Sequence, residues 1–128
     1  MPKEYQRTKN NPYWMPRHVY MQIVYLVRDY DRMKAEADEI LYATPDIQTG
    51  SVSEPGNPTE NKALKIAEMT KKVDAIDAAL RMIPQGYRKG VFNNVAYSTR
   101  YPSIAGMATW ARWRAKLLWY IAKKLYFL

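Results

Sequence analysis

The chain has 128 residues, 48% of them hydrophobic, and a net charge of +8, which fits one small soluble domain with a core of its own. It has no cysteine and one histidine, so disulfides, thiolate metal sites and a metal site built from its own histidines are excluded. It shows no signal peptide, and its longest apolar run, Leu117 to Ala122, is far shorter than the ~20 residues of a membrane span, so we expect a cytoplasmic protein with no cofactor.

Residues 1–16 form the first segment and show no helical or alternating period. They contain three prolines, several aromatic residues and the cations Lys3, Arg7 and Lys9. This composition predicts an N-terminal arm. We expect a tail that faces solvent, and the alternative is that it follows a DNA groove, as basic arms can.

A long helix is predicted from Arg17 onward. Its apolar residues recur at alternating intervals of four and three positions: Val19, Ile23, Leu26, Tyr30, Met33, Ala37 and Ile40. This spacing is typical of one buried helix face. Pro16 suits the first helical position, and Thr44 before Pro45 ends the helix, because a residue that precedes proline is pushed out of helical geometry.

Residues 44–60 hold three prolines and two glycines and predict a mobile loop. Asn57 as cap, Pro58 at the first position and Glu60 in the first turn then mark the start of a second helix. Its apolar seam is Ile66, Met69, Val73, Ile76, Leu80 and Ile83. Two seams of similar length predict an antiparallel helix hairpin over 17–83, and pairing with a second copy of the chain is the alternative.

The remaining region, 84–128, predicts a helix-turn-helix. Pro84 and Gly86 end the second helix, and Tyr87 to Tyr97 predicts a third one with Val91, Phe92, Val95 and Ala96 on one side. Tyr101-Pro102 breaks that helix, and Ser103 to Gly106 is long enough for one helical turn. Thr109 is the predicted cap of a final helix from Trp110 to about Phe127. The expected fold is therefore all-α, with a hairpin followed by a helix-turn-helix.

The charge of the chain is strongly asymmetric. Residues 78–128 contain nine Lys and Arg and no Asp or Glu, a net charge of +9, while residues 1–77 carry −1. On a helical wheel, Trp110, Trp113, Leu117, Ile121 and Leu125 share one side of the last helix, and Arg112, Lys116 and Lys123 share the other with Trp119. Such a cationic face indicates a phosphate-bearing partner, and double-stranded DNA is the predicted one. A merely solvated face is the alternative.

Eight residues are candidates for contact with DNA: Thr109, Arg112 and Lys116 at the base edges and backbone, with Arg114, Lys123, Arg88, Lys89 and Arg100 as further contacts. Trp110 and Trp113 are predicted to pack in the core rather than to stack on bases. Trp119 is predicted to pack against a neighbouring helix, a second subunit or a polymerase.

No enzymatic site is predicted. His18 has no Cys or Ser partner, and the carboxylates Asp29 and Asp31 are two residues apart, so they do not converge on one helix face as a metal site needs. The segment Gln85 to Gly90 lacks the order of a phosphate-binding loop and is predicted to be the turn into the third helix, with Arg88 and Lys89 as backbone contacts.

Three segments resemble the RinA-like group of phage late-gene transcriptional activators: PRHVYMQIVYLVRDYDRMK, ALRMIPQGYRKGVF and YPSIAGMATWARWRAKLLWYIAKKL. The resemblance covers 16–127, interrupted by the loop, and the C-terminal part of that group is similar to region four of sigma-70-type factors. It implies a DNA-binding activator of phage or prophage origin, in a bacterial cytoplasm. It also implies a recognition helix that begins near Thr109 and, together with the helical wheel, places Thr109, Arg112 and Lys116 at the DNA. We expect the hairpin or the N-terminal arm to offer a surface to RNA polymerase.

Two other classes of protein fit parts of the pattern. The last helix, with lysines on one side and Trp, Leu and Tyr on the other, also describes a helix that lies on a membrane surface. The two hydrophobic seams could instead mediate self-association in a helical scaffold or adapter of a phage assembly. The first class is disfavoured because the two preceding helices need a cover for their apolar faces, and the last helix is the natural one.

Overall fold

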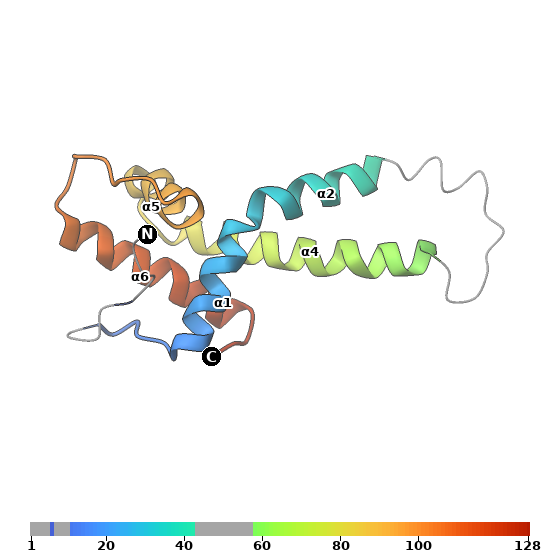
Figure 1. Cartoon of the computed structure of the whole chain (residues 1–128), viewed down its shortest axis with the longest axis horizontal. Coiled ribbons are helices and arrows are strands. Elements are labelled where there is room, and N and C mark those ends of the chain that lie inside the picture. Colours follow the sequence, from blue (N-terminus) through green and yellow to red (C-terminus); the bar gives the residue numbers. More distant parts are fainter. Residues whose placement is uncertain (1–5, 7–10, 43–57) are drawn as a thin grey trace.

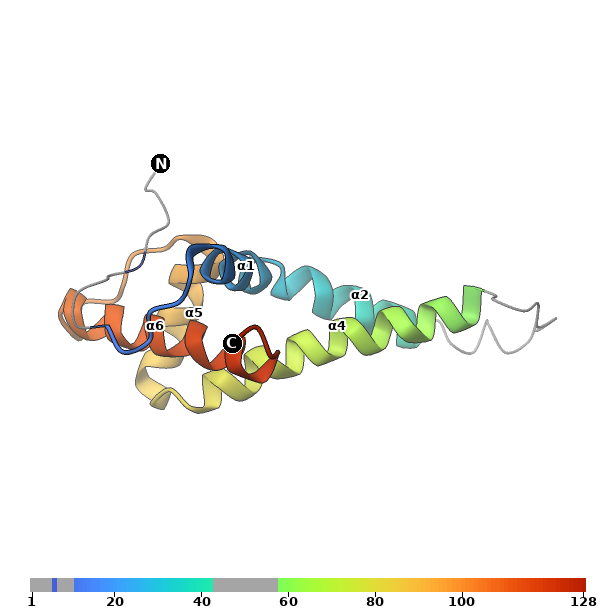
Figure 2. The same cartoon turned by 90° about the horizontal axis from the view of Figure 1, so that it is seen from below.

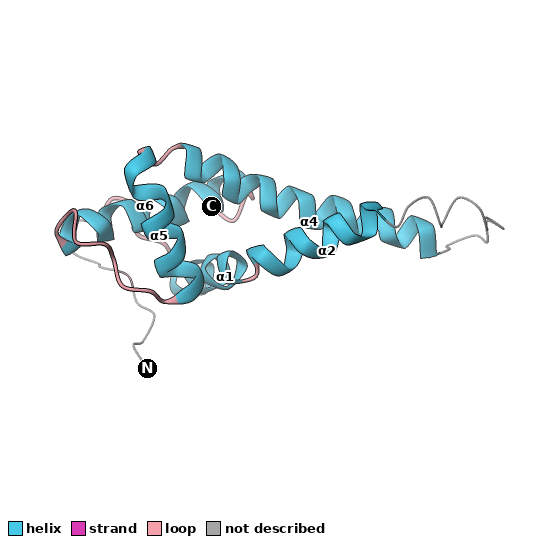
Figure 3. Cartoon of the chain, turned by 90° about the horizontal axis from the view of Figure 1, so that it is seen from above, coloured by secondary structure: helices cyan, strands magenta, loops and turns pink. Residues whose placement is uncertain are grey.

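The computed structural model describes Gln6, residues 11–42 and residues 58–128 (Figure 1). All regular secondary structure in these residues is helical, which confirms the all-α class (Figure 3). The helices are α1 (Arg17–Arg28), α2 (Tyr30–Tyr42), α4 (Pro58–Arg81), α5 (Gln85–Tyr97) and α6 (Met107–Lys124). Helices α1, α5 and α6 form a body together with the C-terminal half of α4, and α2 runs beside the rest of α4 away from it.

The prediction of one long helix from Arg17 onward is wrong in one respect, because the helix is divided at Asp29 into α1 and α2. The backbone N–H of Asp29 still donates to Tyr25 O and Leu26 O, but its ψ of 1° turns the chain. The Asp29 carboxylate accepts a hydrogen bond from Arg32 Nε at 2.6 Å, one turn into α2. As a result, α1 packs into the body, while α2 follows α4.

Helices α2 and α4 run antiparallel and contact each other along their length (Figures 1 and 2). The predicted seams supply the contact, because Met33, Ala37, Met69, Val73 and Ile76 are buried. The side chain of Ile40, the capping residue Asn57 and the loop residues 43–57 lie outside the described residues, and α4 begins at Pro58 as predicted.

Polar contacts join the same two helices. The Tyr30 hydroxyl donates a hydrogen bond to Asp77 Oδ1 at 2.6 Å, and Lys65 Nζ lies 2.5 Å from Glu36 Oε1. Arg32 adds a second ion pair to Glu36 at 2.7 Å. These ion pairs are open to solvent, which screens them, so most of the stability of the helix pair comes from the buried seam.

Helix α6 is the centre of the body. It contacts α1, α4 and α5, and its side chains Trp110, Leu117, Leu118, Ile121 and Ala122 are fully buried. Burial of a large apolar side chain contributes roughly 1.5–3 kcal/mol, so this helix holds the other three together. The prediction that Trp110 packs in the core is confirmed.

The start of α5 and the connection from α5 to α6 differ from the prediction in three places. Gln85 to Gly90 is not a turn but the start of α5, with Pro84 as its N-cap residue. Residues 98–106 contain turns and bends and no helix, so the short helix expected at 103–106 is absent. Helix α6 begins at Met107 after Gly106, so Thr109 lies inside the first turn and does not cap the helix.

Candidate nucleic-acid interface

The outward side of α6 carries three of the predicted contact residues. Arg112 and Lys123 are exposed and Lys116 is half-buried, and together we call them the cationic stripe. Lys123 follows Lys116 by seven residues, which is almost two full helical turns, and Lys116 follows Arg112 by about one turn. All three side chains therefore lie within about 40° of each other around the helix. The half-buried Thr109 lies one turn before Arg112, at the N-terminal end of this side.

Aromatic rings hold the two lysines of the cationic stripe. Lys116 Nζ lies 5.2 Å from the ring centre of Trp113 and 5.6 Å from that of Tyr120. Lys123 Nζ lies 5.1 Å from the ring centre of Trp119. A cation over an aromatic face gains about 0.5–1 kcal/mol at an exposed site. The ammonium groups therefore have a preferred position along the outward side of α6.

Trp119 contacts the N-terminal segment and is partly buried against the hydrophobic core. Its ring meets the edge of Tyr13 with 5.5 Å between the ring centres. This segment is anchored, because Met15 is buried in the core and its N–H donates to Gln6 Oε1 at 3.0 Å. The arm cations Lys3, Arg7 and Lys9 lie outside the described residues.

Arg114 is turned away from the cationic stripe. Its Nε donates to Asn94 Oδ1 of α5 at 3.1 Å, and its Nη1 donates to the hydroxyl of Tyr20 on α1. Sequence reasoning had a signal for this, since Arg114 follows Trp110 by four residues and so lies only about 40° from that core residue. Arg114 therefore joins three helices of the body and is held away from the outward side of α6.

The other three candidate cations, Arg88, Lys89 and Arg100, lie apart from the cationic stripe. Arg88 donates from Nε to Ile83 O at 2.7 Å and from Nη2 to Arg81 O at 3.1 Å, and so satisfies carbonyl groups at the end of α4. Lys89 is exposed on α5. Arg100 lines a pocket with Asn94, Ser98, Thr99, Tyr101 and Met107.

The three ion pairs found among the described residues lie at the junction of α1 and α2, within α2, and between α2 and α4, and they involve Asp29, Arg32, Glu36 and Lys65. Hydrogen bonds to Arg32 and Lys65 hold the pKa values of the Asp29 and Glu36 carboxyl groups below their usual range. Within the described part of the chain, no carboxylate lies within ion-pair distance of the cationic stripe. The positive potential of this surface is therefore not cancelled locally.

Metal-dependent chemistry has no site in the described residues, which contain no cluster of three or more His, Cys, Asp or Glu that could hold a metal ion. His18 is exposed on α1. Among the described helices, none is long and apolar enough to cross a membrane.

The apolar side of α6 is occupied by the core. Trp110, Leu117 and Ile121, which a surface-bound helix would insert into lipid, are fully buried against the other helices. A helix that binds a membrane surface needs this face free. The structure therefore disfavours the interpretation of α6 as a membrane-surface helix.

Comparison of the chain with protein-family models, with curated proteins and with solved structures finds no match. The function therefore has to be argued from the surface of the molecule itself.

Proposed function

We propose that the protein binds double-stranded DNA through the outward side of α6. The observation that carries the proposal is the cationic stripe on a region of 51 residues that contains no acidic residue and a net charge of +9. Neutralised phosphates release condensed counterions, and this release provides most of the affinity of such surfaces for nucleic acid.

The dimensions of the stripe fit a duplex. Arg112 and Lys123 are eleven residues apart, which is about 16 Å along a helix axis. The major groove of B-DNA is about 12 Å wide and admits one helix, with cations at both ends of the helix near phosphates. Ala108 is exposed in the first turn of α6, about 40° from Arg112 around the helix, so this turn is free to approach base edges.

The narrower form of the proposal is a transcriptional activator of phage or prophage late genes. Here α5 and α6 act as a helix-turn-helix, and the antiparallel pair of α2 and α4, as a hairpin, offers a surface to RNA polymerase. The resemblance to RinA-like activators supports this form. The connection of residues 98–106 is longer than the turn of about 3–4 residues in most such motifs, so α6 is less tightly coupled to α5 than usual.

Fluorescence anisotropy with a labelled DNA duplex, repeated over a salt series, tests the proposal. We expect the double variant Arg112→Glu with Lys116→Glu to lose binding and to keep its helical circular dichroism. The matched control is Lys62→Glu with Lys71→Glu, which makes the same change of charge at exposed positions of α4. The control should bind with nearly wild-type affinity.

The salt dependence adds a second measure. Replacing Arg112 and Lys116 by Gln should reduce the slope of log K against log salt concentration by about two, because each lost phosphate contact removes about 0.9. Equal losses in the α6 and α4 variants would show that only net charge matters, and unchanged affinity in the α6 variants would reject this interface. Selection of bound sites from a random duplex pool then tests whether binding is sequence-specific.

A further inference from the structure

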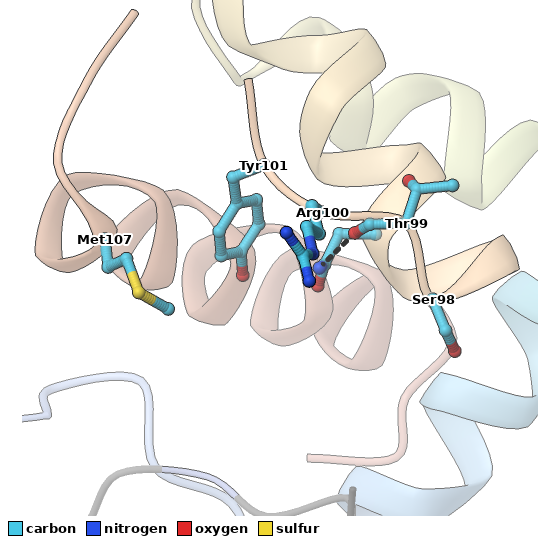
Figure 4. Close-up of a pocket in the computed structure, with 6 residues that line it drawn as sticks. Ser98, Thr99, Arg100, Tyr101 and Met107 are labelled. Carbon is cyan, nitrogen blue, oxygen red and sulfur yellow. Dashed lines mark hydrogen bonds between the residues drawn. The ribbon is translucent and has the colours of Figure 1, made fainter. Parts of the chain in front are cut away.

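A second surface feature lies where α5 ends and α6 begins. It is a shallow pocket of about 420 Å³ lined by Asn94, Ser98, Thr99, Arg100, Tyr101 and Met107 (Figure 4). One side is polar and carries the Arg100 guanidinium, while the hydroxyl groups of Ser98 and Thr99 point away from it to opposite sides. The other side is apolar, where the ring of Tyr101 lies between Met107 and Arg100.

The pocket is separate from the cationic stripe. Met107 precedes Arg112 by five residues and Lys116 by nine, which places these side chains about 140° and 180° away around α6. A ligand in the pocket therefore meets a different side of α6 from the one proposed to meet duplex DNA. Binding in the pocket does not require binding of a duplex.

The backbone of the pocket is held by hydrogen bonds from both helices. Asn94 Nδ2 donates to Thr99 O at 2.7 Å, and Asn94 Oδ1 accepts from Arg114 Nε at 3.1 Å, so the orientation of this amide is fixed. Trp110 Nε1 donates to Pro102 O at 3.0 Å, which holds the backbone two residues after Arg100. Ser98, with φ of 56°, turns the chain out of α5. A pocket formed before binding loses little conformational entropy when a ligand enters.

The electrostatics of the pocket favour an anion. None of its lining residues is acidic, and Arg100 is exposed. A guanidinium binds a phosphate with two parallel hydrogen bonds. The polar side therefore has a group that recognises a phosphate.

The apolar side favours a flat ring. Tyr101 is stacked on the buried Trp110, with 5.3 Å between ring centres and 5° between ring planes, so its position is fixed from the core. Met107 is 77% exposed, and its thioether is a flexible, polarisable surface that packs well against aromatic rings. A ligand with a phosphate at one end and an aromatic base at the other matches both sides.

We propose that this pocket binds a nucleotide, with the phosphate on Arg100 and the base against Tyr101 and Met107. The nucleotide is either a free mononucleotide or an unpaired nucleotide in a strand of nucleic acid. Both have the same chemistry at the pocket, and they differ in whether a chain continues from the phosphate.

Titration of the full chain with adenosine monophosphate, adenosine and inorganic phosphate tests the proposal, with the indole N–H resonance of Trp110 as the readout. This group donates to Pro102 beside the pocket and should shift when the pocket fills. We expect saturable binding of the monophosphate and at least about tenfold weaker binding of adenosine and of phosphate alone. Equal binding of phosphate and the monophosphate would overturn the assignment of the apolar side to a base.

Two variants locate the site. Arg100→Gln should weaken binding of the monophosphate by about tenfold or more, while Met107→Ala should weaken it without changing the response to phosphate. The matched control, Arg81→Gln, removes the same charge from an exposed position on α4 and should bind as the wild type does. Equal losses in the Arg81 and Arg100 variants, or none in the Arg100 variant, would overturn the proposal.

An oligothymidylate single strand without terminal phosphates distinguishes a free mononucleotide from an unpaired nucleotide in a strand. If it binds more tightly than the monophosphate, with the same dependence on Arg100, the ligand is an unpaired nucleotide in a strand. If the monophosphate binds at least as tightly, the ligand is a free nucleotide. The proposal fails if neither probe gives saturable binding.

Discussion

The indole ring of Trp110 lies against the backbone of Gly90. A Cβ atom at Gly90 would be 2.7 Å from one ring carbon of Trp110 and 2.8 Å from another, which is closer than real Cβ contacts. The same indole donates to Pro102 O and stacks on Tyr101. Trp110 thus joins α5, the connection and α6, and glycine is required at the point where the two helices meet.

The first prediction concerns this contact. Gly90→Ala should lower the free energy of unfolding by about 1–3 kcal/mol, because a methyl group forces the buried ring to move. Alanine in a helix would otherwise stabilise by about 0.5–1 kcal/mol relative to glycine. Urea-induced unfolding followed by circular dichroism measures the difference.

Gly86→Ala is the matched control. Gly86 is in the first turn of the same helix, and a Cβ atom there meets nothing within 4 Å. This variant should be as stable as the wild type or slightly more stable. If both glycine variants have the same stability, the contact between α5 and α6 is looser than described.

The second prediction concerns Tyr30, whose hydroxyl donates to Asp77 between α2 and α4. Tyr30→Phe should cost about 0.5–1.5 kcal/mol near neutral pH, where the hydrogen bond is intact. Burial first, and then the hydrogen bond to Asp77, raise the pKa of Tyr30 above its ordinary value. The phenol therefore keeps its proton in the folded protein at a pH where the unfolded chain has lost it.

The sign of the pH dependence follows from this shift. A group whose pKa is raised by folding stabilises the protein fully below its unfolded pKa, about 10 for tyrosine, and loses this contribution as the pH rises further. The stability of the wild type should therefore fall more steeply above pH ~10 than that of Tyr30→Phe. Parallel unfolding curves for both proteins between neutral and alkaline pH would contradict the proposed cause.

The helices were largely predictable because their burial is encoded as a local rhythm. Val19, Ile23, Met33 and Ala37 are buried at the spacing that the sequence displays. The break at Asp29 was not predictable, because the same rhythm continues through it and the turn depends on what α1 and α2 pack against. A periodic pattern fixes which residues face inward along a helix and says little about where its axis bends.

The candidate site was predictable to a smaller extent. The wheel placed Arg112, Lys116 and Lys123 on the outward side of α6, and the structure agrees. The pocket around Arg100 had no signal in the sequence, because it depends on the left-handed conformation of Ser98 and on hydrogen bonds made by Asn94. Contacts of this kind exist only after α5 and α6 have packed.

The third prediction separates two arginines of α6. Arg114→Met should lower the free energy of unfolding by about 1–3 kcal/mol, because it removes the charged donor shared by Tyr20 and Asn94. Arg112→Met should change stability by less than about 0.5 kcal/mol, since Arg112 is exposed. Chemical denaturation of both variants measures this difference.

The effects of the two substitutions on duplex affinity should have the opposite order to their effects on stability. Arg112→Met should weaken binding, while folded Arg114→Met should retain most of it. The roles assigned to the two arginines would be reversed if Arg114→Met were fully stable and failed to bind. Anisotropy measured well below the unfolding temperature of each variant keeps loss of fold apart from loss of contact.

The fourth prediction concerns the seam between α2 and α4. Ile76 is fully buried on α4, and Ile76→Asp would place a carboxylate where no cation or donor is available to it. The cost should exceed about 4 kcal/mol, which is a large part of the ~5–15 kcal/mol that stabilises a small domain. We expect loss of the cooperative unfolding transition in circular dichroism.

Ile76→Val keeps the apolar contact and should cost only about 0.5–1.5 kcal/mol. Leu64→Asp introduces the same charge on the same helix at a side chain that is 62% exposed, and should change stability by less than about 0.5 kcal/mol. If Ile76→Asp unfolds at the same urea concentration as Leu64→Asp, α2 and α4 do not pack through this seam in solution.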